Sequence, residues 1–268
     1  MRLIQTQIPI TDVQASLLIK EGYIAYTSIG YGLSALRRAG IHMQGEYYQA
    51  FFQLSIGLER LMKLLIIQQF RATHSRFPSN KAMKEYGHNL IEIYKKIYEF
   101  EANDKNKEDD TLSIKILEFL SEFAMSSRYY NLDSLTGRQQ TVNPLDQWSK
   151  IQDEIYDRHF RNRKTTPKSK MTDLLIDIMN ENSYVVAYNE KNELFNSTKE
   201  LLIKTEKNKR VQGHSVYYFY LIIQRLVEVL ENIEYDYNLY PCLREFFVLF
   251  NCDMSKSEIL NKKRWLYP

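Results

Sequence analysis

The sequence predicts an all-α protein, and three observations indicate this. Long segments repeat apolar residues every three or four positions, which is the period of a helix with one buried face. The chain of 268 residues contains only 9 glycines and 6 prolines, so few positions interrupt such segments. Runs in which apolar and polar residues alternate, as they do on a half-buried strand, are scarce. Hydrophobic residues make up 44% of the chain, which is enough for a sizeable core.

Four helices are predicted in the N-terminal half of the chain. Thr11 or Asp12 can cap the first helix, and Gly40 ends it. Asp110 or Thr111 opens the fourth helix, directly after the charged loop EANDKNKEDD. The four helices are expected at residues 12–39, 45–73, 79–101 and 111–132.

The C-terminal half is predicted to be helical as well. A helix follows Pro144, and the basic run RNRKTTPKSK after it reads as an exposed connector. Gly213 is expected to separate a long helical segment from the strongly apolar run VYYFYLIIQRLVEVLENI. The expected helices cover residues 145–163, 171–209 with a break near 182, and 216–233, with short helices starting at 243 and 255.

The second helix contains the run LSIGLERLMKLLIIQQF, which is strongly apolar but carries three charges. Glu59 and Lys63 lie four positions apart in the acidic-then-basic order that favours an ion pair on a helix. Arg60 lies away from the apolar stripe, and Gly57 allows another backbone to approach. The stripe expected to be buried contains Phe51, Leu54, Leu58, Leu61, Met62 and Leu65.

Composition and missing motifs limit the range of functions. The chain has 36 basic and 33 acidic residues, so the net charge of +3 implies no overall attraction to nucleic acid. Walker, GxGxxG, HExxH and zinc-ligand patterns are missing, and we expect neither a metal nor a cofactor. Cys242 and Cys252 are the two cysteines, and the sequence leaves their pairing open. With no signal peptide and no apolar run of membrane-spanning length, the predicted location is cytoplasmic.

Three short segments occur in order along the N-terminal half: QLSIGLERLMKLLI, YGHNLIEIYKKI and SSRYYNLDSL. They resemble landmarks of the HEPN superfamily, namely a leucine-rich helix with Glu and Lys, a Gly-His-Asn-Leu helix start and an Arg-Tyr turn. The resemblance covers about residues 12–135. It implies a HEPN-like helical bundle over residues 1–135, with residues 136–268 as a helical extension packed on it or as part of one continuous domain.

The resemblance also implies what the protein does. HEPN proteins are typically dimeric and recur in prokaryotic toxin–antitoxin and antiviral systems, so a homodimer and a partner from such a system are expected. Active members are metal-independent ribonucleases that carry an Arg, four to six residues and then a His. In that chemistry an imidazole moves the proton of the ribose 2′-OH, and a guanidinium holds the scissile phosphate.

Candidate catalytic residues follow from this resemblance. His88 lies in the Gly-His-Asn-Leu segment and Arg128 in the Arg-Tyr turn, and the two are predicted to form a pair in space. Alternatively, His88 bonds backbone groups at a helix start, and Arg128 ties helix ends to a carboxylate such as Glu59. The linear pattern fits only Arg37 and His42, which is a weaker match at the end of the first helix.

Another near match and one basic run complete the candidate residues. Arg210 and His214 miss the pattern by one residue. The run RHFRNRKTTPKSK contains six cations and no acid, so it is predicted to follow an RNA or nucleotide phosphate backbone, or else to be a solvated loop. Its cations are Arg158, Arg161, Arg163, Lys164, Lys168 and Lys170.

Two functional hypotheses therefore remain at the level of sequence. The first is a HEPN-like protein that acts on RNA in stress or antiviral defence as a metal-independent endoribonuclease. The second is a noncatalytic HEPN-like module that binds RNA, a nucleotide or a protein partner as a scaffold or regulator. The poorly placed Arg–His pattern favours the second, whereas the RNA cleavage common in the superfamily favours the first.

Overall fold

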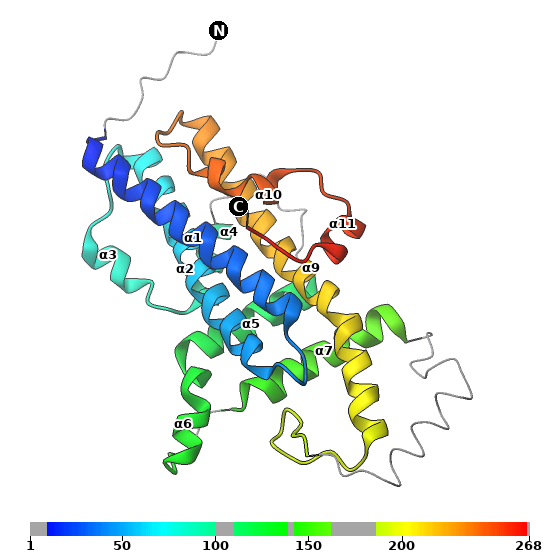
Figure 1. Ribbon diagram of the computed structural model, residues 1–268. Coiled ribbons are helices and arrows are strands. Elements are labelled where there is room, and N and C mark those ends of the chain that lie inside the picture. The colour runs from blue at the N-terminus through cyan, green and yellow to red at the C-terminus, as the bar shows by residue number, and fades with distance from the viewer. Residues whose placement is uncertain (1–9, 100–109, 139–141, 162–185, 267–268) are drawn as a thin grey trace.

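The prediction of an all-α protein is confirmed. A computed structural model describes residues 10–99, 110–138, 142–161 and 186–266 (Figure 1). Helix accounts for 76% of the structure. No strand occurs within these ranges, where the only β pairings are isolated bridges between Gly40 and Met43 and between Tyr188 and Leu194.

The first two helices, α1 (Asp12–Arg38) and α2 (Gln44–His74), pack side by side as a hairpin (Figure 1). Their bounds agree with the predicted ones, and Thr11 closes a capping box at the start of α1. The close approach expected at Gly57 is confirmed, because a Cβ there would lie 2.8 Å from the backbone nitrogen of Ile29. The close packing of the hairpin therefore requires a glycine, which has no Cβ, at position 57.

The single helix expected at residues 79–101 is wrong, because the chain forms two helices there. They are α3 (Asn80–Glu85) and α4 (Leu90–Tyr98). Gly87, with a φ of +54°, adopts a left-handed conformation between them, which a helix does not tolerate. The side chain of Asn89 then caps α4 by accepting from the backbone N–H of Glu92.

The helix expected at residues 111–132 ends earlier than predicted. Helix α5 (Thr111–Met125) begins at the predicted cap, Asp110, and is followed by a 3₁₀ turn, η1 (Ser127–Tyr129). The helix ends where Ser126 leaves helical geometry and its hydroxyl bonds back to the carbonyl of Glu122. A short helix, α6 (Tyr130–Leu135), then projects from the body of the molecule (Figure 1).

In the C-terminal half, α7 (Pro144–Phe160) is capped by Asn143, as a proline in the first turn favours. The longest helix, α9 (Thr198–Asp236), runs without a break through Gly213, so the predicted boundary at that glycine is wrong. A Cβ on Gly213 would lie 2.7 Å from the carbonyl oxygen of Leu260, so the glycine serves a close contact. The segment expected to be helical from 171 lies outside the described residues as far as 185, and residues 186–197 form a loop.

The chain finishes with three short elements at the predicted places. A 3₁₀ turn, η2 (Leu243–Phe247), leads into α10 (Val248–Asn251), and Ser255 caps α11 (Lys256–Asn261). Cys242 and Cys252 are both free thiols, which settles the pairing that the sequence left open.

One hydrophobic core draws on both halves of the chain. Helix α9 packs on α1, α2, α5 and α7, and α11 packs on α9 (Figure 1). The predicted burial of Leu58, Leu61 and Leu65 is confirmed, since each is fully buried. Trp148 of α7 contacts both Phe51 of the first half and Phe219 of the second. The two halves are thus joined through shared aromatic packing.

Candidate functional site

The three charges inside the apolar run of α2 all have partners. Lys63 donates to Glu59 at 2.7 Å, which confirms the predicted pair. Arg60 reaches across the hairpin to Glu21 of α1. Glu59 also faces His88, whose Nδ1 lies 3.0 Å from each carboxylate oxygen. The polar seam of α2 is therefore a line of ion pairs beside the core.

The Glu59–His88 pair joins two of the three segments that resemble HEPN landmarks. Glu59 is largely shielded, with 19% of its side chain exposed, whereas His88 is 73% exposed. Nδ1 bonds to the carboxylate, and Nε2 makes no hydrogen bond within the described part of the chain. A carboxylate that holds Nδ1 fixes the tautomer and leaves Nε2 free to exchange a proton.

The other residues of the Gly-His-Asn-Leu segment hold His88 in place. Asn89 caps α4 and also accepts from the hydroxyl of Ser121 on α5 at 3.1 Å. The same hydroxyl accepts from the backbone N–H of Leu90, a residue with no exposed surface. The segment thus ties α4 to α5 while His88 turns toward α2. The alternative role for His88, bonding backbone groups at a helix start, belongs to Asn89 instead.

Arg128, the predicted partner of His88, has a different contact in this structure. Its guanidinium lies over the ring of Tyr129, 5.1 Å from the centroid. It forms no hydrogen bond or ion pair with His88 or Glu59, all three of which are described. The alternative interpretation expected Arg128 to bind a carboxylate such as Glu59. In the structure, Glu59 binds Lys63 and His88 instead. The Arg128–His88 pair remains a prediction.

In the weaker linear match, the side chains of Arg37 and His42 contact different parts of the protein. Arg37 donates to the carbonyl oxygen of Leu260 at 3.4 Å, and burial lowers the pKa of its guanidinium. His42 lies on the turn after α1, with Nε2 3.3 Å from the hydroxyl of Thr205 on α9. These contacts tie α1 to α11 and α9, and they do not bring the two side chains to one phosphate.

Only residues 158–161 of the basic run lie within the described residues. Arg158 bonds both oxygens of Asp110 at 2.7 Å and also the hydroxyl of Thr111, so it fastens α7 to the start of α5. Arg161 is exposed at the end of α7. The other predicted phosphate ligands, Arg163, Lys164, Lys168 and Lys170, lie outside the described residues.

A second histidine cluster was missed by sequence reasoning. The rings of His159 and His214 are in contact, with centroids 4.1 Å apart and planes inclined by 33°. Nε2 of His159 lies 2.8 Å from the hydroxyl of Tyr218. Burial, followed by the charges of Lys256 and Arg158, lowers the pKa of His159. The near match of Arg210 and His214 was the only sequence signal for this cluster, because its members come from separate helices.

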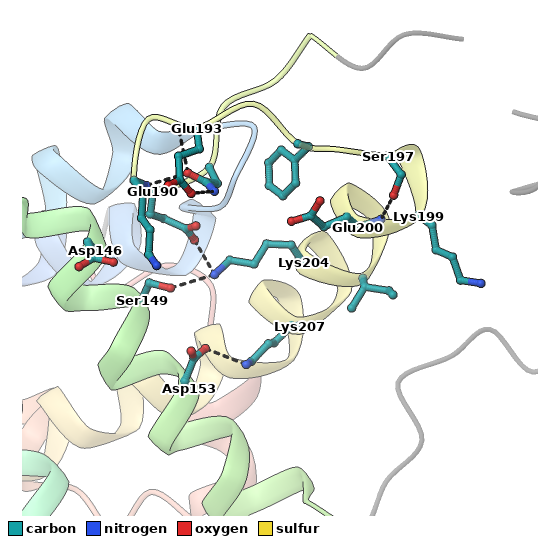
Figure 2. Close-up of a pocket in the computed structure, with 14 residues that line it drawn as sticks. Asp146, Ser149, Asp153, Glu190, Glu193, Ser197, Lys199, Glu200, Lys204 and Lys207 are labelled. Atoms are coloured by element: carbon teal, nitrogen blue, oxygen red, sulfur yellow. Dashed lines mark hydrogen bonds and ion pairs between the residues drawn. The ribbon is translucent and has the colours of Figure 1, made fainter. Parts of the chain in front are cut away.

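A cavity of about 710 Å³ lies between α7, the start of α9 and the loop before it (Figure 2). Lys204 reaches into it, with Nζ 2.9 Å from Oε1 of Glu190 and donating to Ser149 at 2.9 Å. Lys207 of α9 bonds Asp153 of α7 at 2.7 Å. Both lysines are therefore paired with carboxylates of the cavity lining.

Within the described residues, no group of three or more His, Cys, Asp or Glu side chains is arranged to hold a metal ion. Among the helices in those same ranges, none is both long enough and apolar enough to cross a membrane.

The fold and these contacts define the class of the protein as an all-α helical bundle with a paired carboxylate–histidine dyad at its surface. Comparison of the chain with protein-family models, with curated proteins and with solved structures finds no match.

Proposed function

We propose that this chain is a HEPN-like protein that acts on RNA in prokaryotic stress or antiviral defence, as a metal-independent endoribonuclease. One observation carries the proposal: His88 is held by Glu59 through Nδ1, with its ring 73% exposed. A histidine in this arrangement accepts a proton at Nε2, and the carboxylate stabilises the imidazolium that forms. The resemblance of both segments to HEPN landmarks supports RNA as the substrate.

The proposed reaction needs only groups of this chain and of the RNA. Nε2 of His88 takes the proton of a ribose 2′-OH, and the oxygen attacks the adjacent phosphorus. The P–O5′ bond breaks, and the 5′ oxygen takes up the proton that His88 had accepted, so the products are a cyclic phosphate and a 5′-hydroxyl and His88 is neutral again. Arg128 is the proposed ligand of the phosphate, since a guanidinium stays charged throughout and its exposed position on η1 leaves it free to move.

Cleavage of single-stranded RNA in the presence of EDTA tests this proposal. His88→Ala should lower the rate about 10²- to 10⁴-fold, the usual contribution of a general base. Glu59→Gln should lower it less, because Nδ1 keeps a hydrogen-bonding partner. Arg128→Lys should retain more activity than Arg128→Ala if the residue contacts phosphate.

The control for this experiment is His42→Ala, which removes another exposed histidine. It should cleave as the wild type does, with unchanged helical circular dichroism. Loss of activity in His42→Ala or Arg37→Ala, with His88→Ala unaffected, would move the site to the linear match. Wild-type protein that never cleaves RNA would refute the ribonuclease.

A noncatalytic module that binds a protein partner is the second candidate function, and α6 favours it. Leu132 and Leu135 of this helix are 62% and 83% exposed, and Tyr129 of η1, directly before it, is 53% exposed. A six-residue helix with such an apolar face gains little stability in water unless another surface covers it. The partner is proposed to be a second copy of the chain, as in the predicted homodimer, or a protein of a defence system.

Light scattering at micromolar concentration tests the homodimer. The wild type should have twice the mass of the chain, and Leu132→Glu with Leu135→Glu should give the monomer if α6 lies in the interface. The double variant Val13→Glu with Leu17→Glu, on the exposed face of α1, is the matched control. Wild-type protein that is monomeric at all concentrations would contradict the dimer.

A further inference from the structure

Aromatic rings and cations gather where the end of α7 meets α9 and α11. The rings of His159 and His214 contact each other there at a tilted angle, and Phe160 packs edge-on against His214 with centroids 5.1 Å apart. Lys256 of α11 lies over the ring of Tyr217, 4.7 Å from its centroid. We call this region the α7–α9–α11 surface, and its elements differ from those that form the Glu59–His88 dyad.

Two further cations border the α7–α9–α11 surface. Arg161 is exposed at the end of α7, and Arg210 lies one helical turn before His214 on α9. Neither forms a hydrogen bond or ion pair with another described residue. Lys256 is exposed as well and contacts a ring rather than a carboxylate. Three charges on three elements are therefore available to an anion.

The carboxylate beside the cluster is already bound. Asp110, whose charge also acts on His159, accepts from Arg158 through both oxygens at 2.7 Å. Within the described residues, Arg161, Arg210 and Lys256 have no carboxylate partner, so all three can contact a phosphate.

Partly exposed rings beside cations suit one class of ligand. His159, His214 and Tyr217 are each partly exposed. Arg161 and Lys256 are exposed and Arg210 is half-buried, so rings and cations are both accessible on this surface. Single-stranded nucleic acids bind such surfaces by stacking bases on rings while cations follow the phosphates. A folded protein partner would instead need a continuous apolar centre, which these polar rings do not provide.

We infer that the α7–α9–α11 surface binds single-stranded RNA through Arg161, Arg210 and Lys256, with Tyr217 stacking on a base. The choice of RNA over DNA rests on the proposed function, whereas the contacts to phosphates and bases rest on the surface itself. The surface holds the strand on elements other than those of the dyad. Its loss should weaken binding without removing the chemistry at His88.

Binding of a labelled single-stranded RNA of about 12 nucleotides, within the usual site size, tests this inference. All variants carry His88→Ala so that the RNA stays intact. The triple variant Arg161→Ala, Arg210→Ala and Lys256→Ala should bind at least tenfold more weakly than the parent. For the triple variant, the slope of log K against the logarithm of the salt concentration should be less negative by about 2, because each lost phosphate contact removes about 0.7 from that slope.

The matched control removes the same net charge elsewhere. Lys20, Lys95 and Lys150 are exposed lysines of α1, α4 and α7, and their triple alanine variant should bind within about twofold of the parent. Tyr217→Ala should lose about tenfold in affinity, and Tyr217→Phe should keep it, because stacking needs only the ring. Circular dichroism confirms that each variant is folded.

Three results would overturn the inference. They are equal weakening of the two triple variants, unchanged binding in the surface triple, or preferred binding of single-stranded DNA. If the wild type cleaves RNA while the surface triple binds like its parent, the inference alone fails. If the protein neither binds nor cleaves RNA, the inference and the proposed function both fail. The surface triple made with His88 intact should still cleave at saturating RNA, and this result together with weakened binding supports both.

Discussion

Replacing Leu61 with alanine is expected to lower the free energy of unfolding by about 2–5 kcal/mol. Leu61 has no exposed surface and lies in the middle of α2, which packs against α1, α4, α5 and α9. A helix enclosed on so many sides relaxes little when a side chain is shortened, so a cavity remains and the cost exceeds the transfer free energy alone.

Urea unfolding followed by circular dichroism measures this loss. Ile56→Ala is the control, because Ile56 lies on the same helix but is 44% exposed. Its cost should stay below about 1 kcal/mol, as at most partly exposed positions. A loss below about 1 kcal/mol for Leu61→Ala would show that the core collapses around the gap or that α2 is loosely packed.

Replacing Glu234 with alanine should be about as damaging, at roughly 3–5 kcal/mol. Its carboxylate is fully buried and accepts from the backbone N–H groups of Leu243 and Arg244 at 2.7 and 3.2 Å. The guanidinium of Arg244 and the amide of Gln68 also donate to it. Alanine would leave these four donors without their acceptor, and a buried donor without a partner is costly.

Glu234→Gln separates charge from hydrogen bonding in this network. Glutamine keeps one acceptor oxygen for the turn after α9, so its loss in thermal or urea unfolding should be smaller than that of alanine. Asn232→Ala, an exposed change on the same helix, should leave stability within about 0.5 kcal/mol. Equal stability of Glu234→Ala and wild type would show that the turn rearranges to satisfy its own N–H groups.

Residues of the candidate site were predictable where the signal was local. The Glu59–Lys63 pair follows from a four-residue spacing on one helix, and the structure has it. The contact of His88 with Glu59 joins residues 29 positions apart, and no local pattern specifies it. The His159–Tyr218 contact spans 59 positions, so it too depended on how α7 crosses α9.

The sequence by itself determined the all-α class, the extents of α1 and α2 and the buried leucine stripe of α2. These follow from helical periodicity and from caps such as Thr11, which act within a few residues. The same local rules predicted a boundary at Gly213, where α9 in fact continues.

Only the tertiary structure decided the backbone conformations of Gly213 and Gly87. Gly213 stays helical because packing against α11 requires a position without a Cβ, and the stability of a 39-residue helix outweighs the propensity cost of one glycine, about 1 kcal/mol. Gly87 takes a left-handed conformation instead, because the chain there turns His88 toward Glu59 and Asn89 toward Ser121. Helix propensity is a difference of about 1 kcal/mol, and contacts between distant segments exceed it.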